Sequence, residues 1–424
     1  MTLHCSIGDP SAVCRPRPHR GQRPWGRGST SDYRGSDSRA SRERGCTSRP
    51  SRRGSRTPNR KRDAVVKVLS VVGARPQFVK LAPIAAELER RGDEHVIVHT
   101  GQHYDVNMSD VFFSDLGIAA PDDHLAVGSD THGRQTGAML AAMDEVLERH
   151  QPDWVLVYGD TNSTIAGALA AVKSHIRVAH LEAGLRSFNR RMPEEHNRVM
   201  TDHAADLCLA PTEVAMAHLR EEGLSDRSVL VGDVMTDVLY QVRDRVVGEE
   251  PAVPAQLASE PFRVATLHRA ENTDDPHRLA AIIKALGSLP EPTLLLAHPR
   301  LRARAAEQGL DLAVGSLVVS DPLAYPQLVS AVMASIGVVT DSGGLQKEAF
   351  LLRVPCVTVR SETEWTETVD LGWNVLAEDP AQLPEAVLSL DPHATTAAPY
   401  GDGHAARRAI EAILAHGGSR ACSR

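Results

Sequence analysis

The chain has 424 residues, 42% of them hydrophobic and 24% charged, and a net charge of −7 at pH 7. This length exceeds one ordinary hydrophobic core, so two domains are expected. No apolar run approaches the roughly 20 residues that span a bilayer, which indicates a soluble protein and excludes a helical membrane protein.

Residues 1–63 differ in composition from the rest of the chain. The first 60 contain 14 Arg, no Lys and four acids, a net charge of +10, with much Ser, Gly and Pro and no apolar periodicity. This composition predicts disorder and lacks the apolar stretch of a secretory signal. A nucleic-acid-binding tail is one interpretation. A mis-assigned start codon is preferred, because the first foldable pattern begins at Val65.

The cysteines indicate a reducing compartment. Only Cys208 and Cys356 lie in sequence that looks folded, both inside apolar runs, and no CxxC pair occurs. Neither a zinc ribbon nor a disulfide framework is expected, and a cytoplasmic location fits best.

From residue 64 onward, short β-rich runs alternate with helical patterns. In the stretch 77–92 a helix is predicted, because Phe78, Leu81, Ala85 and Leu88 share one face and Gly92 follows as a stop. A second, Ala-rich helix is predicted over 165–173. Strands are expected at 67–74, 95–101, 154–160 and 177–184. Apolar strands that alternate with helices predict a Rossmann-like domain with a parallel sheet over 64–248.

A Pro-, Ala- and acid-rich stretch at 249–260 is read as a linker, and a second Rossmann-like domain is expected over 261–415. Its strands are expected at 262–272, 292–300, 316–322, 335–344 and 354–361. The predicted fold class is therefore α/β, with two doubly wound Rossmann-like domains facing a cleft. Ligands of such sheets bind beyond the carboxyl ends of the strands.

The segment "VVTDSGGLQKEAF" at 338–350 carries a phosphate-binding pattern. A strand runs into Ser342, Gly343 and Gly344, where backbone N–H groups and a helix dipole favour an anion. Glu348, one helical turn on, is placed to accept hydrogen bonds from ribose hydroxyls. The alternative is an ordinary strand–helix turn. Neither GxxxxGK[ST] nor GxGxxG occurs at a strand–helix junction, which disfavours a P-loop kinase and a standard dehydrogenase.

Cations and histidines follow other predicted strands. Arg75 and Lys80 are candidates for an anion clamp, or else solvated surface cations. His268 and His298 each follow a strand of the second domain, and this repetition favours contact with substrate by at least one of them. No HExxH or tight ligand spacing supports a metal site.

Several acids stand where strands of the first domain end. Asp160 follows "WVLVY", Glu182 follows "VAHL", and Glu194 and Glu195 follow Pro193. Capping of a helix by Asp160 or Thr161 explains one acid but not several at one sheet edge. Carboxylates beside cations in a cleft suit proton transfer.

Together these motifs resemble the non-hydrolysing UDP-N-acetylglucosamine 2-epimerase family. The resemblance extends over roughly residues 66–414. It rests on the ordered motifs "GARPQFVK", "HTGQHYD", "YGDTNST", "HLEAGLRS", "MPEEHNR", "LHRAEN", "HPR", "TDSGGLQKEA" and "PYGDG".

This resemblance implies a glycosyltransferase-B-like fold, a homodimer, a UDP-sugar substrate and no cofactor. It implies reversible inversion at C2 of the sugar, in which UDP is eliminated to give 2-acetamidoglucal and is then added back. By motif, the acid/base and charge-stabilising roles fall on Asp160, Glu182, Glu194 and His268. Contact with the substrate falls on His298, on Ser342, Gly343 and Gly344 at the diphosphate, and on Glu348 at the ribose. Arg75 and Lys80 would either contact the diphosphate or support the catalytic acids. The direction in which each acid works is left open.

Three positions bear on allostery and on the choice of sugar. In part of the family a second UDP-N-acetylglucosamine binds as an activator near a QH element, which Gln102 and His103 match, although Tyr104 and Asp105 depart from the activated enzymes. Trp365 stands where many members have Arg. The replacement removes a positive charge. In this feature the chain resembles enzymes that act on UDP-2,3-diacetamido-2,3-dideoxyglucuronate as well as on UDP-N-acetylglucosamine.

Four alternatives to UDP-N-acetylglucosamine epimerisation stay open. An epimerase of the diacetamido-uronate would need a cation for the C6 carboxylate, with Arg186, Arg190 and Arg191 as candidates. The others are the hydrolysing relative, a glycosyltransferase on the same fold, and a nucleotide-sugar sensor that uses the basic tail. The cluster of acids disfavours the transferase, because transfer on that fold depends mainly on stabilising the diphosphate.

Overall fold

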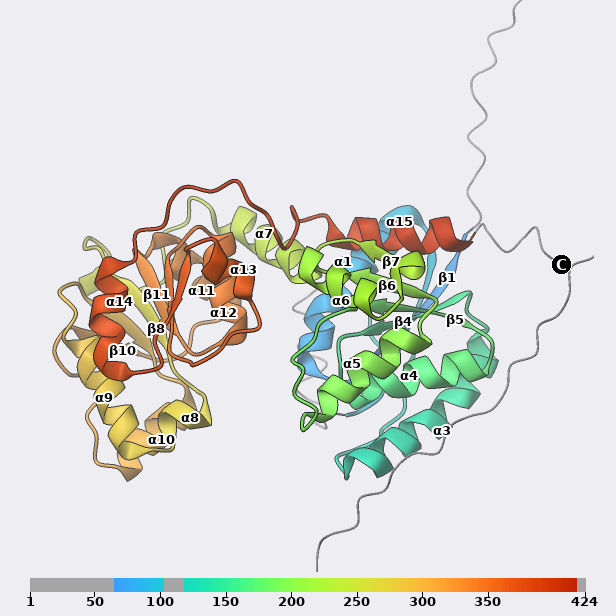
Figure 1. Cartoon of the computed structure of the whole chain (residues 1–424), viewed down its shortest axis with the longest axis horizontal. Coiled ribbons are helices and arrows are strands. Elements are labelled where there is room, and N and C mark those ends of the chain that lie inside the picture. Colours follow the sequence, from blue (N-terminus) through green and yellow to red (C-terminus); the bar gives the residue numbers. More distant parts are fainter. Residues whose placement is uncertain (1–64, 103–117, 418–424) are drawn as a thin grey trace, which may run out of the picture. The chain divides into compact units, whose positions relative to one another are not determined.

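The computed structural model describes residues 65–102 and 118–417, which form two parallel-sheet α/β domains (Figure 1). The segment 1–63 and His103, for which predictions were made above, lie outside the described residues. None of the helices within the described ranges is both long and apolar enough to cross a bilayer.

The first domain contains a seven-stranded parallel sheet with the order β3-β2-β1-β4-β5-β6-β7. Its strands are β1 (Lys67–Val72), β2 (Glu94–His99), β3 (Asp123–His124), β4 (Trp154–Tyr158), β5 (Arg177–Leu181), β6 (Leu207–Ala210) and β7 (Ser228–Leu230). The order reverses between β1 and β4, and such a switch point is where open α/β sheets bind ligands.

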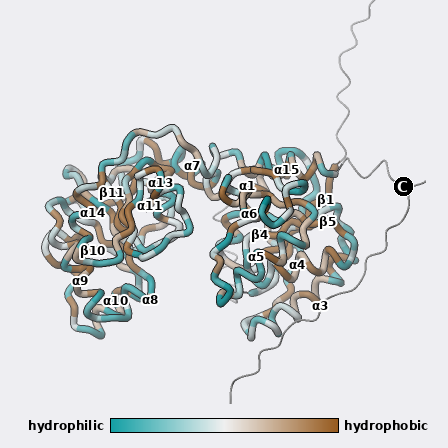
Figure 2. Tube along the Cα trace, viewed as in Figure 1, coloured by the Kyte–Doolittle hydropathy of each residue, from teal (hydrophilic) through white to brown (hydrophobic). Residues whose placement is uncertain are grey.

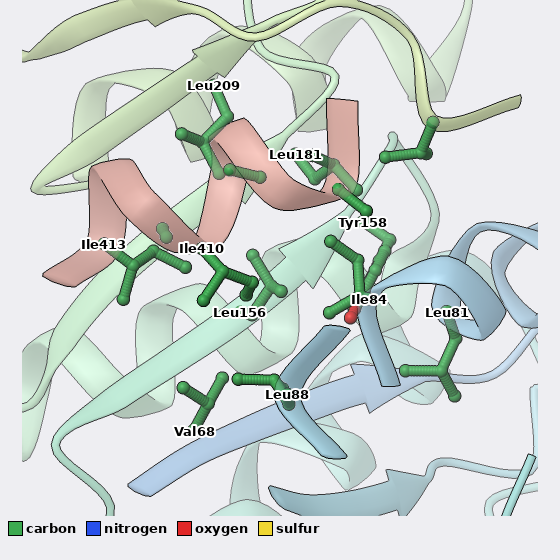
Figure 3. Close-up of a cluster of buried hydrophobic side chains, with 14 of the residues drawn as sticks. Val68, Leu81, Ile84, Leu88, Leu156, Tyr158, Leu181, Leu209, Ile410 and Ile413 are labelled. Carbon is green, nitrogen blue, oxygen red and sulfur yellow. The ribbon is translucent and has the colours of Figure 1, made fainter. Parts of the chain in front are cut away.

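Helices cover both faces of this sheet, as the near-continuous apolar strands predict. The helices of this half of the chain are α1 (Arg75–Arg91), α3 (His132–His150), α4 (Asn162–Lys173), α5 (Pro193–Ala204), α6 (Glu213–Glu221) and α7 (Val234–Val246). On one face the strands pack against α1, whose residue Phe78 is buried, as expected. Leu81 and Leu88 of the same helix are also buried there (Figure 3). On the other face they pack against α3, α4 and α6.

The second domain repeats the pattern with a six-stranded parallel sheet of order β10-β9-β8-β11-β12-β13. Its strands are β8 (Arg263–Thr266), β9 (Thr293–Leu296), β10 (Leu317–Ser320), β11 (Gly337–Thr340), β12 (Cys356–Thr358) and β13 (Asn374–Leu376). The switch point lies between β8 and β11. Figure 2 shows hydrophobic residues, in brown, around β11, and the residues of this strand are all buried.

The helices of this half of the chain form layers around the second sheet, except α15, which packs against the first domain. They are α8 (Ala270–Thr273), α9 (Pro276–Gly287), α10 (Pro299–Glu307), α11 (Tyr325–Ala334), α12 (Gly343–Leu351), α13 (Thr366–Asp370), α14 (Leu383–Ser389) and α15 (Ala405–Gly417). One face packs against α9, α10 and α14 and the other against α11 and α12.

Among the differences from the sequence-based expectations, three concern a helix start and the extent of the domains. Helix α4 begins at Asn162 rather than at 165, because Thr161 caps it. Within the expected linker, Leu257 is buried against Phe262 and Val264 in the core of the second domain. Helix α15, which the predicted second domain included, packs its residues Ile410 and Ile413 into the core of the first domain (Figure 3).

Candidate active site

Asp160 and Glu182 follow the carboxyl ends of two neighbouring strands, β4 and β5. Tyr158 of β4 pairs with Leu181 of β5, so the two loops lie side by side at one edge of the sheet. Thr161 caps α4 by accepting a hydrogen bond from the backbone N–H of Thr164. Asp160 is therefore free of the capping role that was the alternative explanation for it.

Lys80, on α1, forms a hydrogen-bonded ion pair with the carboxylate of Glu182. Their side chains are only 15% and 8% exposed, so Lys80 is not a solvated surface cation. Burial lowers the pKa of Lys80, but the charges of Glu182, Asp233 and Asp160 outweigh this effect and the pKa is raised. Lys80 therefore stays charged beside both acids. Arg75 begins the same helix, and its role stays a prediction.

Arg198, on α5, connects Asp160 to the acids of that helix. Its Nε and Nη2 atoms donate to Oδ2 of Asp160 at 2.9 and 2.6 Å, and Nη1 donates to Glu195 at 3.0 Å. Burial lowers the pKa of Arg198, but the carboxylates of Asp160 and Glu195 outweigh this effect and the pKa is raised overall. The sequence placed Arg198 next to the acids without assigning it a role, because its partner Asp160 is 38 residues away.

The adjacent acids Glu194 and Glu195 have different environments. Glu195 is buried and accepts hydrogen bonds of 2.9 Å from the backbone N–H and the hydroxyl of Ser187 and from the backbone N–H of Phe188. Burial raises the pKa of Glu195, but these donors and Arg198 lower it overall, so Glu195 anchors the loop before α5. Glu194 is half-buried and has no side-chain hydrogen bond to any described residue, which leaves it available to a ligand.

Arg186 is not available for a sugar carboxylate, which corrects one of the expectations above. Its side chain is 1% exposed and donates to Asp202 at 2.7 Å and to Glu222 at 2.8 Å. Arg190 and Arg191, from the same candidate set, lie in an exposed stretch of the loop before α5.

At the switch point of the second sheet, Asp341 follows β11 and holds the turn after β8. Its buried carboxylate accepts hydrogen bonds of 3.0–3.1 Å from the backbone N–H groups of His268 and Arg269 and from the amide of Asn272. The ring of His268 lies 3.1 Å from the same carboxylate through Nδ1. Asp341 lies within the motif that predicted a phosphate site, but no role was predicted for Asp341 itself.

His268 and His298, which each follow a strand of the second sheet, lie near one another, and the substrate contact expected of at least one of them stays a prediction. Their ring centroids are 6.3 Å apart, and both residues are exposed. His298 also caps α10 by accepting a hydrogen bond of 3.2 Å from the backbone N–H of Arg300. His298 thus combines a local structural role with access to a ligand.

Ser342, Gly343 and Gly344 open helix α12, as the phosphate pattern predicted. Ser342 is the N-cap and accepts from the backbone N–H of Leu345, and Gly343 and Gly344 are the first helical residues. A Cβ atom on Gly343 would lie 2.5 Å from Oε1 of Glu364. A side chain at Gly343 would therefore require the carboxylate of Glu364 to move away from the N-terminus of α12.

Glu348 and Trp365 lie close to the same helix. Glu348 accepts a hydrogen bond of 2.9 Å from the hydroxyl of Tyr325, and burial raises its pKa. The ring of Trp365 has Lys347 4.1 Å above its centroid. Arg360, which is buried, donates to Glu364 at 2.8 Å and thus places a cation in the loop that carries Trp365.

Gln102 belongs to the element that suggested an allosteric site. Its Oε1 atom accepts hydrogen bonds from the backbone N–H of Ser163 at 3.1 Å and from the hydroxyl of Ser163 at 2.7 Å. Gln102 therefore has a structural role at the start of α4, and the allosteric role of Gln102 and His103 stays a prediction.

The arrangement of these groups can be compared with known proteins. The family model described as UDP-N-acetylglucosamine 2-epimerase matches residues 86–414. A UDP-2,3-diacetamido-2,3-dideoxy-D-glucuronate 2-epimerase from Pseudomonas aeruginosa is 48% identical, over 73% of this chain and 88% of that protein. A UDP-N-acetylglucosamine 2-epimerase from Methanocaldococcus jannaschii is 38% identical, over 83% of this chain and 100% of that protein.

The fold is also similar to solved structures. The crystal structure of the Methanocaldococcus jannaschii UDP-GlcNAc 2-epimerase in complex with UDP-GlcNAc and UDP matches with a TM-score of 0.69 and 38% identity. The match covers 82% of this chain and 99% of that one.

Proposed function

The chain belongs to the UDP-N-acetylglucosamine 2-epimerase family, and from this premise we propose that it interconverts UDP-N-acetylglucosamine and UDP-N-acetylmannosamine by inversion at C2. The observation that carries the proposal is the pair of acids, Asp160 and Glu182, at the ends of adjacent strands with Lys80 beside them. Acids placed at one sheet edge and paired with cations suit the transfer of a proton to and from carbon.

The reaction proceeds by elimination and addition. A base takes the C2 proton, the C1–O bond to UDP breaks with its electron pair on the departing phosphate, and a C1=C2 double bond forms in 2-acetamidoglucal. A proton then returns to C2 from the other face while a UDP oxygen attacks C1. Asp160, Glu182, Glu194 and His268 are the groups proposed to handle these protons and the developing charge.

The neighbours of the acids fit these roles. Arg198 directs two of its N–H groups, on Nε and Nη2, at Oδ2 of Asp160, so Oδ1 is the oxygen left to exchange a proton. Lys80 offsets the charge of Glu182. Glu194 has no competing hydrogen-bond partner among the described residues, which favours it over Glu195 as the group of α5 that meets the sugar.

The diphosphate of the substrate is proposed to bind at the N-terminus of α12. Ser342, Gly343 and Gly344 offer backbone N–H groups and the positive end of the helix dipole. Glu348, whose pKa is raised by burial, is proposed to meet the ribose hydroxyls, and His298 and Arg75 to contact the nucleotide.

A second candidate substrate is UDP-2,3-diacetamido-2,3-dideoxyglucuronate. The 48% identity to the Pseudomonas aeruginosa enzyme of that name supports it. Such a donor carries a C6 carboxylate that needs a cation. Arg190 and Arg191 are the remaining candidates, since Arg186 is fully engaged by Asp202 and Glu222.

A comparison of the two donors tests the substrate assignment. The purified enzyme is given each donor in turn, and kcat/KM is measured for both. A higher value for UDP-N-acetylglucosamine supports the first proposal. A higher value for the uronate, with a loss of about tenfold or more in an Arg190→Ala/Arg191→Ala variant for that donor alone, would replace it with the second.

We also propose that the enzyme acts in the cytoplasm as a homodimer. The free, buried thiols of Cys208 and Cys356 are compatible with a reducing compartment, and the dimer follows from the family resemblance. Light scattering on the purified protein tests the second part, because a dimer has twice the 45.8 kDa of the chain.

A further inference from the structure

A buried polar network lies directly behind the two acids at the edge of the first sheet. His180, on β5, and Asp202, on α5, are both 0% exposed, and Nδ1 of His180 lies 2.6 Å from Oδ1 of Asp202. The other ring nitrogen, Nε2, lies 2.7 Å from the backbone carbonyl of Gly159. A carbonyl oxygen and an ionised carboxylate accept hydrogen bonds, and a ring with protons on both nitrogens would satisfy both partners.

The charges in this network balance. Asp202 accepts hydrogen bonds through Oδ2 from the backbone N–H of Gly184 at 3.0 Å and from Arg186 at 2.7 Å. Arg186 also donates to Glu222 at 2.8 Å through two nitrogens. Burial raises the pKa of Asp202, but His180 and Arg186 lower it overall. With both ring nitrogens protonated, two cations face two anions, which is the condition under which buried charges are tolerated.

Each end of the network holds the backbone next to one acid. The ring of His180 binds the carbonyl of Gly159, which precedes Asp160, and Asp202 binds the N–H of Gly184, two residues after Glu182. Glu182 itself has φ of +69°, a left-handed conformation that is unfavourable for a residue with a side chain. Other contacts must hold the backbone at Glu182 in this conformation. The network holds it through His180, two residues before Glu182, and through Gly184, two residues after it.

The turn at Gly184 adds a second constraint to the same loop. Gly184 has φ of +82°, and a Cβ atom there would lie 2.4 Å from the carbonyl oxygen of Ala215. The loop that carries Glu182 is therefore fixed between the network on one side and α6 on the other.

We propose that His180 is a positioning residue, whose buried imidazolium, bound to Asp202 and Arg186, sets the places of Asp160 and Glu182 for proton transfer at C2. The inference rests on the proposed function, because it assigns the two acids their roles in that reaction. His180 touches no substrate in this scheme, so its effect is on turnover and not on affinity.

The test compares His180→Gln with a matched control, His95→Gln. Gln has one donor group and no charge, so it cannot bind Gly159 and Asp202 as the imidazolium does. His95 lies on β2 of the same sheet and bonds to Ser70 at 2.8 Å, away from both acids. We expect kcat to fall about 10²-fold in His180→Gln, as small displacements of reacting groups produce, with KM and the Kd for UDP unchanged. His95→Gln should keep the wild-type kcat.

Equal kcat in the two variants, or an equal loss of UDP affinity in both, would overturn the positioning role. Nitrogen NMR of the wild-type protein at pH 7 tests the imidazolium without relying on a variant that folds. Both ring nitrogens of His180 should carry protons, whereas His95, whose pKa burial lowers to about 4, should show one bare nitrogen. A bare ring nitrogen on His180 would also overturn the proposal.

These results separate this inference from the proposed function. If the wild-type enzyme turns over neither donor, the proposed function fails. The protonation of His180 would then still be read from the spectrum.

Discussion

Asp160 and Glu182 follow adjacent strands but are held by different cations, Arg198 and Lys80. If both acids move protons, replacing either with its amide removes the acid/base function and keeps the side-chain shape. We expect Asp160→Asn and Glu182→Gln each to lower turnover by about 10²-fold or more. The Kd for UDP, measured by calorimetry, should stay close to wild type.

The matched control for Glu182→Gln is Glu87→Gln, on α1. Glu87 pairs with Arg90 on the same helix and contacts neither acid. Turnover in this control should be unchanged. Wild-type turnover in both Asp160→Asn and Glu182→Gln would remove these residues from the proposed site.

Asp341 gives a prediction on stability and pH. Burial raises its pKa, but hydrogen bonds from His268, Arg269 and Asn272 lower it below the usual value. A carboxylate with a lowered folded-state pKa stabilises the fold above its unfolded-state pKa of about 3.9, and this stabilisation is lost as the pH falls through the folded-state pKa. Asp341→Asn should therefore cost about 2 kcal/mol at pH 7, and the cost should shrink below about pH 4.

Thermal unfolding of the wild type and Asp341→Asn at pH 7 and at about pH 3.5 checks this expectation. The difference in Tm should be larger at pH 7. A difference that stays constant or grows in acid would contradict the hydrogen-bonded, ionised state of Asp341.

At the scale of elements, the start of helix α12 is proposed to bind the diphosphate. A side chain on Gly343 would displace Glu364, whose carboxylate lies 2.5 Å from the position of the Cβ atom, and would occupy the approach to the helix N-terminus. We expect Gly343→Val to weaken UDP binding at least about tenfold, since close backbone approach is lost. The measurement is the Kd for UDP by calorimetry.

Gly137→Ala, in α3, is the matched control. A Cβ atom there meets nothing within 4 Å, so this change should leave UDP binding unaltered and stabilise the helix by about 0.5–1 kcal/mol. Unchanged UDP affinity in Gly343→Val would move the diphosphate away from α12.

Sequence reasoning succeeded where local patterns decide the structure and failed where distant partners do. The face of α1 that carries Phe78 and Leu88 follows from helical spacing, and the strand ends that carry Asp160 and Glu182 follow from apolar runs. Which of Glu194 and Glu195 is anchored did not follow, because adjacent helical residues point in different directions and only the loop at Ser187 decides between them.

Two further misses have the same cause. The burial of Arg186 depends on its ion pairs with Asp202 and Glu222, and no local sequence pattern predicts those ion pairs. Helix α15 has an amphipathic pattern that fits either domain, and its packing against the first sheet depends on contacts with strands more than 200 residues earlier.

At the scale of the whole molecule, a buried ion pair connects the start of α7 to α12. Lys347, on α12, pairs with Asp233, the N-cap of α7, and their side chains are 5% and 0% exposed. Removing Lys347 leaves the buried carboxylate of Asp233 without its partner. Lys347→Met should therefore lower the free energy of unfolding by about 3–5 kcal/mol.

A double-mutant cycle separates the pair from its surroundings. Asp233→Asn keeps a side-chain oxygen that accepts from the backbone N–H of Met235, because Asn is also a good N-cap residue. The double variant Lys347→Met/Asp233→Asn should therefore be destabilised by less than the sum of the single variants in denaturant unfolding. Additive costs would show that the two residues do not interact.

Proton NMR in D₂O detects the removal and return of the C2 proton of a UDP-sugar, which is the step proposed for this enzyme. The enzyme is incubated with UDP-N-acetylglucosamine, and in parallel with the diacetamido-uronate donor, without added cofactor. Deuterium at C2 together with the signal of the C2 epimer is the predicted result for the true substrate. No exchange with either donor, by an enzyme shown to bind UDP, would contradict the account.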